Sequence, residues 1–308
     1  MYFAYRPKWM IGVMGERKKI IVATHGEDID GIASLALILK VYPDVQAIFS
    51  RPADIKRVMM YIDIVLDLPK PRNCGICIDH HESNYRELVK RGMLTDRDLV
   101  DPKAPSAACL VAKYFGLNDD VAREIVDMAN KADTGRFDEE LVKLDLFIKT
   151  NISDKSELIW LAKKLSELGK AIFDDEEYRE KLKKLGPVIE KSRKVVEIAK
   201  SLAERGLKFA IFDATRVPYA ISRAPASVFV KNGGFVAISF YIEPDTGRRK
   251  VSIRVGEYDF KANEFASRFG GGGHRKAAGV VLRSESKLAM LIKEFVEMIE
   301  YPIIFVQL

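Results

Sequence analysis

The chain has 308 residues, an ordinary globular composition and a net charge of +6 at pH 7. This length allows two domains, and the modest positive charge is compatible with an anionic substrate. No apolar run reaches the roughly 18 residues of a membrane span, and three cysteines do not make a secreted disulfide scaffold. Residues 1–16 lack the order of a signal peptide, so we expect a terminal arm on a cytoplasmic protein.

The first third of the chain alternates between strand and helix patterns. Apolar runs of strand length lie at Lys19–Thr24, Val45–Phe49, Asp63–Leu68 and Gly75–Asp79. Between them, helices are expected at Asp30–Val41 and, as a short helix, at Asp54–Tyr61. Buried strands separated by helices indicate a parallel sheet that is covered on both faces.

The middle of the chain, from about Ser106 to Leu207, has a helical pattern. Amphipathic helices are expected at Ala107–Phe115, Asp119–Lys131 and Ser156–Ile172. A further segment, Glu176–Ala203, is rich in Lys and Glu at i,i+4 spacing and is interrupted by Pro187. We therefore divide the chain into an N-terminal domain at 1–150, a helical connector at 151–206 and a C-terminal domain at 207–308.

Beyond Leu207 the pattern becomes that of a smaller, mixed-sheet α/β domain. Strands are expected at Phe209–Phe212, Phe235–Glu243, Lys250–Val255 and Ala278–Leu282. A Pro-Asp-Thr-Gly turn at 244–247 joins two of them into a hairpin. Helices are expected at Asn263–Phe269 and Lys287–Ile299. The apolar tail Ile303–Leu308 is either a further strand or a subunit contact, which is compatible with a homo-oligomer.

The four histidines all lie in short motifs that are rich in Asp or Gly. They are His25 in Thr-His-Gly-Glu-Asp-Ile-Asp-Gly, His80 and His81 in Ile-Asp-His-His, and His274 after Gly270–Gly273. Imidazole beside carboxylates is a ligand set for Mn²⁺, Zn²⁺ or Fe²⁺. A single histidine in such a motif would usually be structural, but four of them favour a metal site.

Three expected strands place candidate ligands at one edge of the first sheet. His25, Asp67 and His80 all lie at the carboxyl ends of their strands, where open α/β sheets bind ligands. Further carboxylates are Asp28 and Asp30 in the turn after the first strand and Asp133 at a helix end. Each acid could instead cap a helix or close a turn. Together they would supply the ligands of two cations that polarise a phosphoryl group and activate water.

The glycine run before His274 is expected to be a loop that lets the backbone approach an anion closely. Such loops can also be flexible turns with solvated basic neighbours. Here the segment stands between two apolar stretches, and basic residues flank it, which favours contact with phosphate. The candidate substrate-binding residues are Arg254, Gly271, Gly272, Gly273, His274 and Arg275.

Taken together, these motifs resemble the DHH phosphoesterase superfamily. The segment Val65–His81, with Asp67 followed by Asp-His-His, resembles its metal-binding domain, and Gly-Gly-Gly-His resembles its DHH-associated C-terminal domain. The resemblance covers roughly 18–135 and 208–300. It implies a parallel-sheet DHH domain, a helical connector and a smaller C-terminal domain, with the active-site cleft between the domains.

The resemblance also implies roles for individual residues. His25 and Asp28 would bind one metal ion and Asp30 the other, Asp67 would bridge both, and His80 and Asp133 would complete the second site. His81 would face the scissile phosphate as a catalytic residue, and Asp79 would orient the histidines. Arg254, the glycine run and His274 would hold the substrate from the second domain. The metal ions would most often be Mn²⁺, with Mg²⁺ or Co²⁺ as alternatives.

One feature departs from the family pattern. The leading histidine usually precedes the two acids as H-x-D-x-D or H-x-x-x-D-x-D, whereas this chain has H-x-x-D-x-D at 25–30. Glu27 could therefore replace or supplement His25 as a ligand.

The sequence favours a metal-dependent phosphodiesterase that cleaves single-stranded or very short nucleic acid, as an exonuclease or oligoribonuclease does. One alternative is a hydrolase of small nucleotides, either a pAp phosphatase or a cyclic dinucleotide phosphodiesterase. Another is a nucleic-acid-binding subunit without activity, for which the shifted position of His25 is the one argument.

Overall fold

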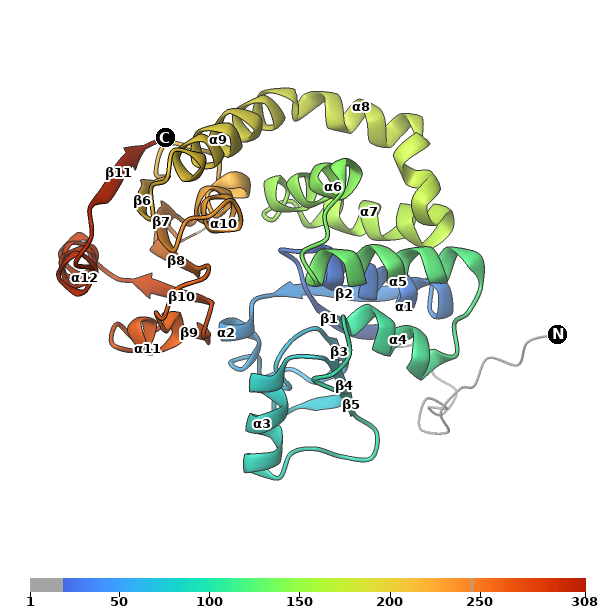
Figure 1. Ribbon diagram of the computed structural model, residues 1–308. Coiled ribbons are helices and arrows are strands. Elements are labelled where there is room, and N and C mark those ends of the chain that lie inside the picture. The colour runs from blue at the N-terminus through green and yellow to red at the C-terminus, as the bar shows by residue number, and fades with distance from the viewer. Residues whose placement is uncertain (1–18, 245) are drawn as a thin grey trace, which may run out of the picture. The chain divides into compact units, whose positions relative to one another are not determined.

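The computed structural model describes residues 19–244 and 246–308 (Figure 1). They form two compact units, the first ending at Lys183 and the second comprising Lys184–Leu308. The expected arm at residues 1–16 and Asp245 of the expected turn lie outside the described residues. The predicted α/β class is confirmed, while the three-part division at residues 150 and 206 stays a prediction.

The first unit is built on a five-stranded, all-parallel sheet with the strand order β2-β1-β3-β4-β5. Its strands are β1 (Ile20–His25), β2 (Val45–Ser50), β3 (Ile62–Leu66), β4 (Cys74–Asp79) and β5 (Leu99–Val100). On one face, side chains of β1, β3 and β4 pack in a cluster with Ile55 of α2 (Pro52–Ile55). Parallel strands buried on both faces read as continuous apolar runs, which is the pattern that the sequence shows.

Helices complete the first unit. They are α1 (Ile29–Val41), α3 (Glu82–Arg91), α4 (Ala107–Phe115), α5 (Asp120–Asp133), α6 (Glu139–Thr150), α7 (Lys155–Leu168) and the 3-10 helix η2 (Gly169–Asp174). The apolar helix α1 contacts β1 and β3 and also packs against α4, α5 and α7. Its residues Ile29 to Leu39 are buried, so α1 forms the centre of this unit. None of the helices that the structure describes is long and apolar enough to span a bilayer.

The second unit contains a six-stranded mixed sheet in the order β11-β6-β7-β8-β10-β9. Its strands are β6 (Phe209–Asp213), β7 (Val236–Ile242), β8 (Arg249–Val255), β9 (Gly272–His274), β10 (Ala277–Leu282) and β11 (Ile303–Gln307). Its helices are α9 (Gly186–Glu204), η3 (Tyr219–Ile221), α10 (Ala224–Lys231), α11 (Ala262–Ser267) and α12 (Glu285–Met298), and α8 (Glu176–Lys184) spans the boundary. Phe265 of α11 and Phe295 of α12 join the core of β7, β8 and β10.

Most of the predicted elements are confirmed, including the break near Pro187, which lies in the first turn of α9, and the strand at the apolar tail. The expected helix Asp54–Tyr61 is wrong beyond Ile55, because Met59, Met60 and Tyr61 are exposed and have no core to cover. The prediction missed α3, whose only buried residue is Leu88. The glycine run is not wholly a loop, since Gly272–His274 pairs with β10 as a strand.

Candidate metal centre

The turn between β1 and α1 brings His25 and Asp28 together. Asp28 is the N-cap of α1 and accepts a hydrogen bond from the Gly31 N–H at 3.0 Å through Oδ1. Its other oxygen, Oδ2, lies 2.6 Å from Nδ1 of His25. A Cβ on residue 31 would lie 2.0 Å from the carbonyl oxygen of His25, so only glycine allows the helix to begin so close to the strand. Asp28 thus serves as a helix cap and a candidate ligand.

Asp67 occupies the centre of the site, directly after β3. Oδ2 lies 3.5 Å from Nδ1 of His25, while Oδ1 lies 3.7 Å from Nε2 of His80 and 3.4 Å from Nδ1 of His81. The two oxygens therefore face different groups of candidate ligands. Asp67 has a φ of +52°, a left-handed conformation that Asp tolerates better than most residues. This local strain turns the carboxylate out of the strand into the site.

A second group forms around His80. Its Nε2 lies 2.9 Å from Oδ2 of Asp133, at the last residue of α5, and 3.6 Å from Oδ2 of Asp30. Nδ1 of His80 lies 3.3 Å from the carbonyl oxygen of Ala104. In the neutral tautomer whose Nδ1–H donates a hydrogen bond to this carbonyl, Nε2 presents a lone pair to a cation. Residues far apart in the sequence thus converge at the carboxyl edge of the sheet.

Asp30 also organises the helix next to the site. Its oxygens accept hydrogen bonds from the N–H groups of Ala107 and Ala108 at 2.6 and 2.8 Å, at the start of α4. Ser106, to which the sequence assigned no role, is the N-cap of α4 and donates to Oδ1 of Asn130 at 2.6 Å. These contacts fix the buried Asp30 carboxylate while leaving it within reach of His80.

Asp79 is fully buried and fixes His80 and His81 through contacts of its carboxylate. Its Oδ1 lies 2.9 Å from Nδ1 of His81 and accepts from the backbone N–H of His80 at 2.8 Å, while Asn84 donates to Oδ2 at 2.5 Å. Asn84 was not among the residues predicted from the sequence, although its place in the first turn after Asp-His-His could have indicated it. His81, with a side chain 43% exposed, keeps Nε2 available for other contacts.

The candidate ligands form three groups whose donor atoms lie within 4.8 Å of one another, and Asp67 belongs to two of them. The groups are His25, Asp28 and Asp67; Asp67, His80 and His81; and Asp30, His80 and Asp133. All six residues predicted as metal ligands are included, together with His81. Glu27 belongs to none, since its Oε1 lies 2.5 Å from Nε of Arg51, so the geometry favours His25.

The chemistry of this donor set fits divalent cations. Oδ1 of Asp67 is buried and has no hydrogen-bonding partner among the described residues, and the buried Nε2 of His80 faces only carboxylate oxygens there, the nearest being Asp133 Oδ2 at 2.9 Å. Buried polar atoms normally have a hydrogen-bonding partner, and a bound cation would take the place of that partner here. The groups bring together four aspartates, whose combined charge two divalent cations would balance. Imidazole and carboxylate donors suit Mn²⁺, Zn²⁺ and Fe²⁺.

The pKa shifts reveal how much negative charge is gathered here. Burial, together with the neighbouring carboxylate of Asp28, raises the pKa of Asp67 to about 6. Burial and the carboxylates of Asp67 and Asp133 raise the pKa of Asp30 as well. Burial opposes charge on His80, but the carboxylates of Asp133, Asp30 and Asp67 outweigh it and raise its pKa to about 10. Without cations, protons on these groups partly offset the crowded carboxylates.

The candidate substrate-binding residues lie in the second unit. Arg254 on β8 is half-buried, and its guanidinium donates to Oγ of Ser227 at 3.2 Å and to the Ile253 carbonyl at 2.9 Å. Arg275 and His274 are exposed, and Arg275 pairs with Asp259 at 2.7 Å. Gly271, Gly272 and Gly273 precede them. A Cβ at Gly271 would lie 2.3 Å from the Gly279 carbonyl, so this approach of β10 also requires glycine.

Comparisons with known proteins agree with this architecture. Residues 208–300 match the DHHA1 domain model. A pGpG-specific phosphodiesterase, PggH from Vibrio cholerae, has the same fold at a TM-score of 0.61 and 17% identity, over 91% of this chain and 98% of that one. Residues 208–300 therefore form a DHHA1 domain, and the chain as a whole has the fold of this phosphodiesterase. The predicted resemblance is thereby confirmed.

Two RecJ structures also have the same fold as this chain. RecJ from Thermus thermophilus in complex with Mn²⁺ matches at a TM-score of 0.50 and 16% identity, covering 94% of this chain but 54% of that RecJ. An exonuclease RecJ bound to manganese matches at a TM-score of 0.50 and 14% identity, over 92% of this chain and 91% of that one. No curated protein sequence matches at a significant level.

Proposed function

We propose that this DHH protein is a phosphodiesterase that depends on two divalent metal ions and hydrolyses short, single-stranded nucleic acid. The observation that carries the proposal is the position of Asp67, whose two oxygens face the separate groups around His25 and His80. A carboxylate shared in this way suits a pair of cations about 3.5–4 Å apart. The manganese-bound RecJ structures support Mn²⁺ as the metal to test first.

The residues of the metal centre would have different roles. His25, Asp28, Asp30, Asp67, His80 and Asp133 would hold the ions, which when bound polarise the phosphoryl group and activate water. Asp79 keeps the His81 ring in place through the contact at Nδ1, leaving Nε2 to face the scissile phosphate or the leaving oxygen. Asn84 fixes the Asp79 carboxylate in turn.

The second unit would supply the contacts to substrate phosphate. Arg254 presents a planar fork of donors, which is suited to phosphate oxygens, and its position is fixed by Ser227. The glycine run offers backbone N–H groups without side chains in front of them. We assign His274 and Arg275 to the same role, so that the first unit would perform the chemistry and the second would contact the substrate phosphate.

Substrate length is the finer part of the proposal. The fold likeness spans nearly all of the pGpG-specific phosphodiesterase but only about half of the Thermus RecJ. The TM-score to the pGpG-specific phosphodiesterase, 0.61, also exceeds the 0.50 to either RecJ structure, which supports a dinucleotide substrate. We infer that linear dinucleotides and other very short oligonucleotides are the preferred substrates.

The test is hydrolysis with Mn²⁺ of a panel that contains GpG, 20-mers of RNA and single-stranded DNA, a cyclic dinucleotide and pAp. The proposal expects the highest kcat/KM on the linear dinucleotide and loss of activity with EDTA. Faster release of mononucleotides from the 20-mers would favour an exonuclease, and preference for pAp would favour a phosphatase. No turnover of any substrate with Mn²⁺, Mg²⁺ or Co²⁺ would contradict the proposal and favour the binding subunit.

A further inference from the structure

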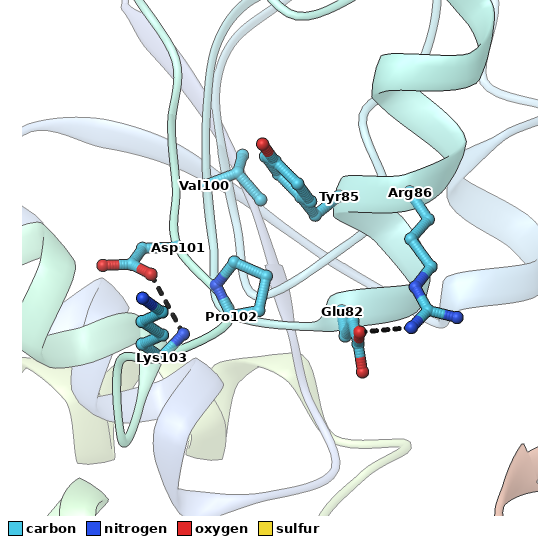
Figure 2. A pocket seen from close by; sticks show the side chains of 7 residues that line it. All are labelled: Glu82, Tyr85, Arg86, Val100, Asp101, Pro102 and Lys103. Carbon is cyan, nitrogen blue, oxygen red and sulfur yellow. Dashed lines mark hydrogen bonds and ion pairs between the residues drawn. The ribbon is translucent and has the colours of Figure 1, made fainter.

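A pocket of about 330 Å³ lies in the first unit between α3 and the segment that follows β5 (Figure 2). Its size falls at the lower end of the range of small-molecule sites, roughly 300–1,000 Å³. Tyr85 and Arg86 line it from the helix, and Val100, Pro102 and Lys103 line it from the opposite side. Neither the metal centre nor the sequence motifs account for this pocket.

Both walls of the pocket are attached to residues of the metal centre. Glu82, which lines it, directly follows His81, so its Cα lies at most about 7.6 Å from that of His80. On the other wall, Lys103 precedes Ala104, whose carbonyl oxygen contacts His80 Nδ1. The N–H of Asp101 donates to the Asp79 carbonyl at 3.1 Å. The pocket is therefore formed by segments that adjoin the candidate ligands in the chain.

The lining of the pocket combines an aromatic face with a paired donor and acceptor. The Tyr85 side chain is partly exposed, and Val100 and Pro102 add apolar surface. Figure 2 shows the Glu82–Arg86 pair at one end of the pocket, and the atoms Oε1 and Nη2 of this pair lie 2.5 Å apart. An apolar wall with a few polar groups at the rim is the usual form of a site for a flat heterocycle.

We propose that this pocket binds a guanine base of the substrate, next to the nucleotide linkage that is cleaved; this assignment rests on the proposed function. The purine face would stack on the Tyr85 ring, as bases do on aromatic side chains of single-strand-binding proteins. Arg86 would donate to the O6 acceptor of guanine, which Arg commonly recognises. Glu82 would accept from the neighbouring N–H donors of the base. Adenine carries an amino group in place of O6 and would face Arg86 with a donor.

The first test is binding, because it does not depend on turnover. Isothermal titration of the Mn²⁺-loaded protein with 5′-GMP and 5′-AMP should show tighter binding of GMP. Tyr85→Ala should weaken GMP binding about ten- to hundredfold, whereas Tyr85→Phe retains the ring and should bind as the wild type does. Arg86→Ala should remove the preference for GMP over AMP. Manganese content and the circular dichroism spectrum check that each variant is folded and loaded.

A matched control lies on the same helix. Arg91 pairs with Glu87 at 2.8 Å, four residues apart like Arg86 and Glu82, but it does not line the pocket. Arg91→Ala should therefore keep the preference for GMP. Equal loss in the two arginine variants would indicate a general charge effect and overturn the base assignment. Unchanged GMP binding in Tyr85→Ala would overturn it as well.

A second readout separates this inference from the proposed function. Methyl p-nitrophenyl phosphate is a phosphodiester without a base, so its hydrolysis reports on the metal centre. Wild-type turnover of this compound and of GpG, with kcat/KM for GpG unchanged in Tyr85→Ala, would leave the phosphodiesterase intact and overturn the pocket. Absence of turnover together with GMP binding that depends on Tyr85 would uphold the pocket and contradict the phosphodiesterase.

Discussion

The metal centre of the first unit and the basic region of the second hold their charges in opposite ways. Asp30 and Asp67 are 1% and 2% exposed and lie among other carboxylates, so burial and like charge raise their pKa values. Arg275 and Lys276 are exposed, and they pair with Asp259 and Glu257 at 2.7 and 3.2 Å. In the first arrangement protons on the histidines offset the carboxylates only in part, and cations would supply the remaining charge, whereas surface ion pairs of the second kind are worth little to stability.

Arg254 is the exception in the second unit. It is half-buried beside Arg223, and burial together with this positive neighbour lowers its pKa. No carboxylate is among its hydrogen-bonding partners in the described part of the chain, which are Ser227 and the Ile253 carbonyl. An arginine held in this way is ready for an external anion. We therefore expect the activity to depend most on the buried charged residues of each unit.

The largest effect is expected from Asp67→Asn. A neutral amide bridges two cations poorly, so we expect activity to fall on the order of 10²-fold or more. Metal content, measured by mass spectrometry after dialysis, should fall toward one ion or none. Asp63→Asn is the matched control, because Asp63 lies on β3, the strand that Asp67 follows, accepts from the Ile21 N–H at 2.8 Å and belongs to no group of candidate ligands. Near-normal turnover of Asp67→Asn with two ions bound would rule out the bridging role.

A smaller effect, confined to substrate, is expected from Arg254→Ala. Loss of one charge-assisted contact costs about 1.5–3 kcal/mol, which corresponds to roughly a ten- to hundredfold lower kcat/KM. Metal content should stay at the wild-type level, because the residue belongs to no candidate metal group. Arg249→Ala, on the same strand but paired with Glu285, should change kcat/KM little. A loss of metal from Arg254→Ala would contradict the assignment of metal binding to the first unit and of phosphate contact to the second.

The smallest expected effect concerns how substrate binding depends on salt concentration. A long strand that followed Arg248, Arg249 and Lys250 would release more counterions than a dinucleotide and would bind with a steeper dependence on salt. However, Lys250 is paired with the buried Glu243, and Arg249 with Glu285. We therefore expect similar slopes of log Kd against log salt for GpG and a 20-mer, measured with Ca²⁺ in place of the active metal. A clearly steeper slope for the 20-mer would reveal an extended track.

The sequence allowed much of the metal centre to be predicted because parallel strands end at one edge. His25, Asp67 and His80 each close a strand or follow one directly, and this rule alone brings them together. Asp133 is different, since a helix end can point anywhere, so the sequence offered it as a further carboxylate but did not fix its position. The structure places its carboxylate 2.9 Å from His80.

Other parts of the site depend on tertiary contacts that no local pattern encodes. Glu27 and His25 are two residues apart and both could bind metal, but the partner that engages Glu27, Arg51, comes from the segment after β2. The pocket beside α3 requires Tyr85 to meet Pro102, and α3 itself has too few buried positions to show a clear helical period. The glycine strand β9 was missed because glycine has no side chain to reveal a pattern.

Anomalous diffraction from crystals grown with Mn²⁺ would locate the ions of the proposed paired-cation centre. We expect two manganese peaks about 3.5–4 Å apart. Asp67 should contact both ions, and the His25 imidazole nitrogen should lie about 2.0–2.3 Å from one of them. A single peak, or two peaks with Asp67 bound to neither or to only one, would rule out a pair of cations bridged by Asp67.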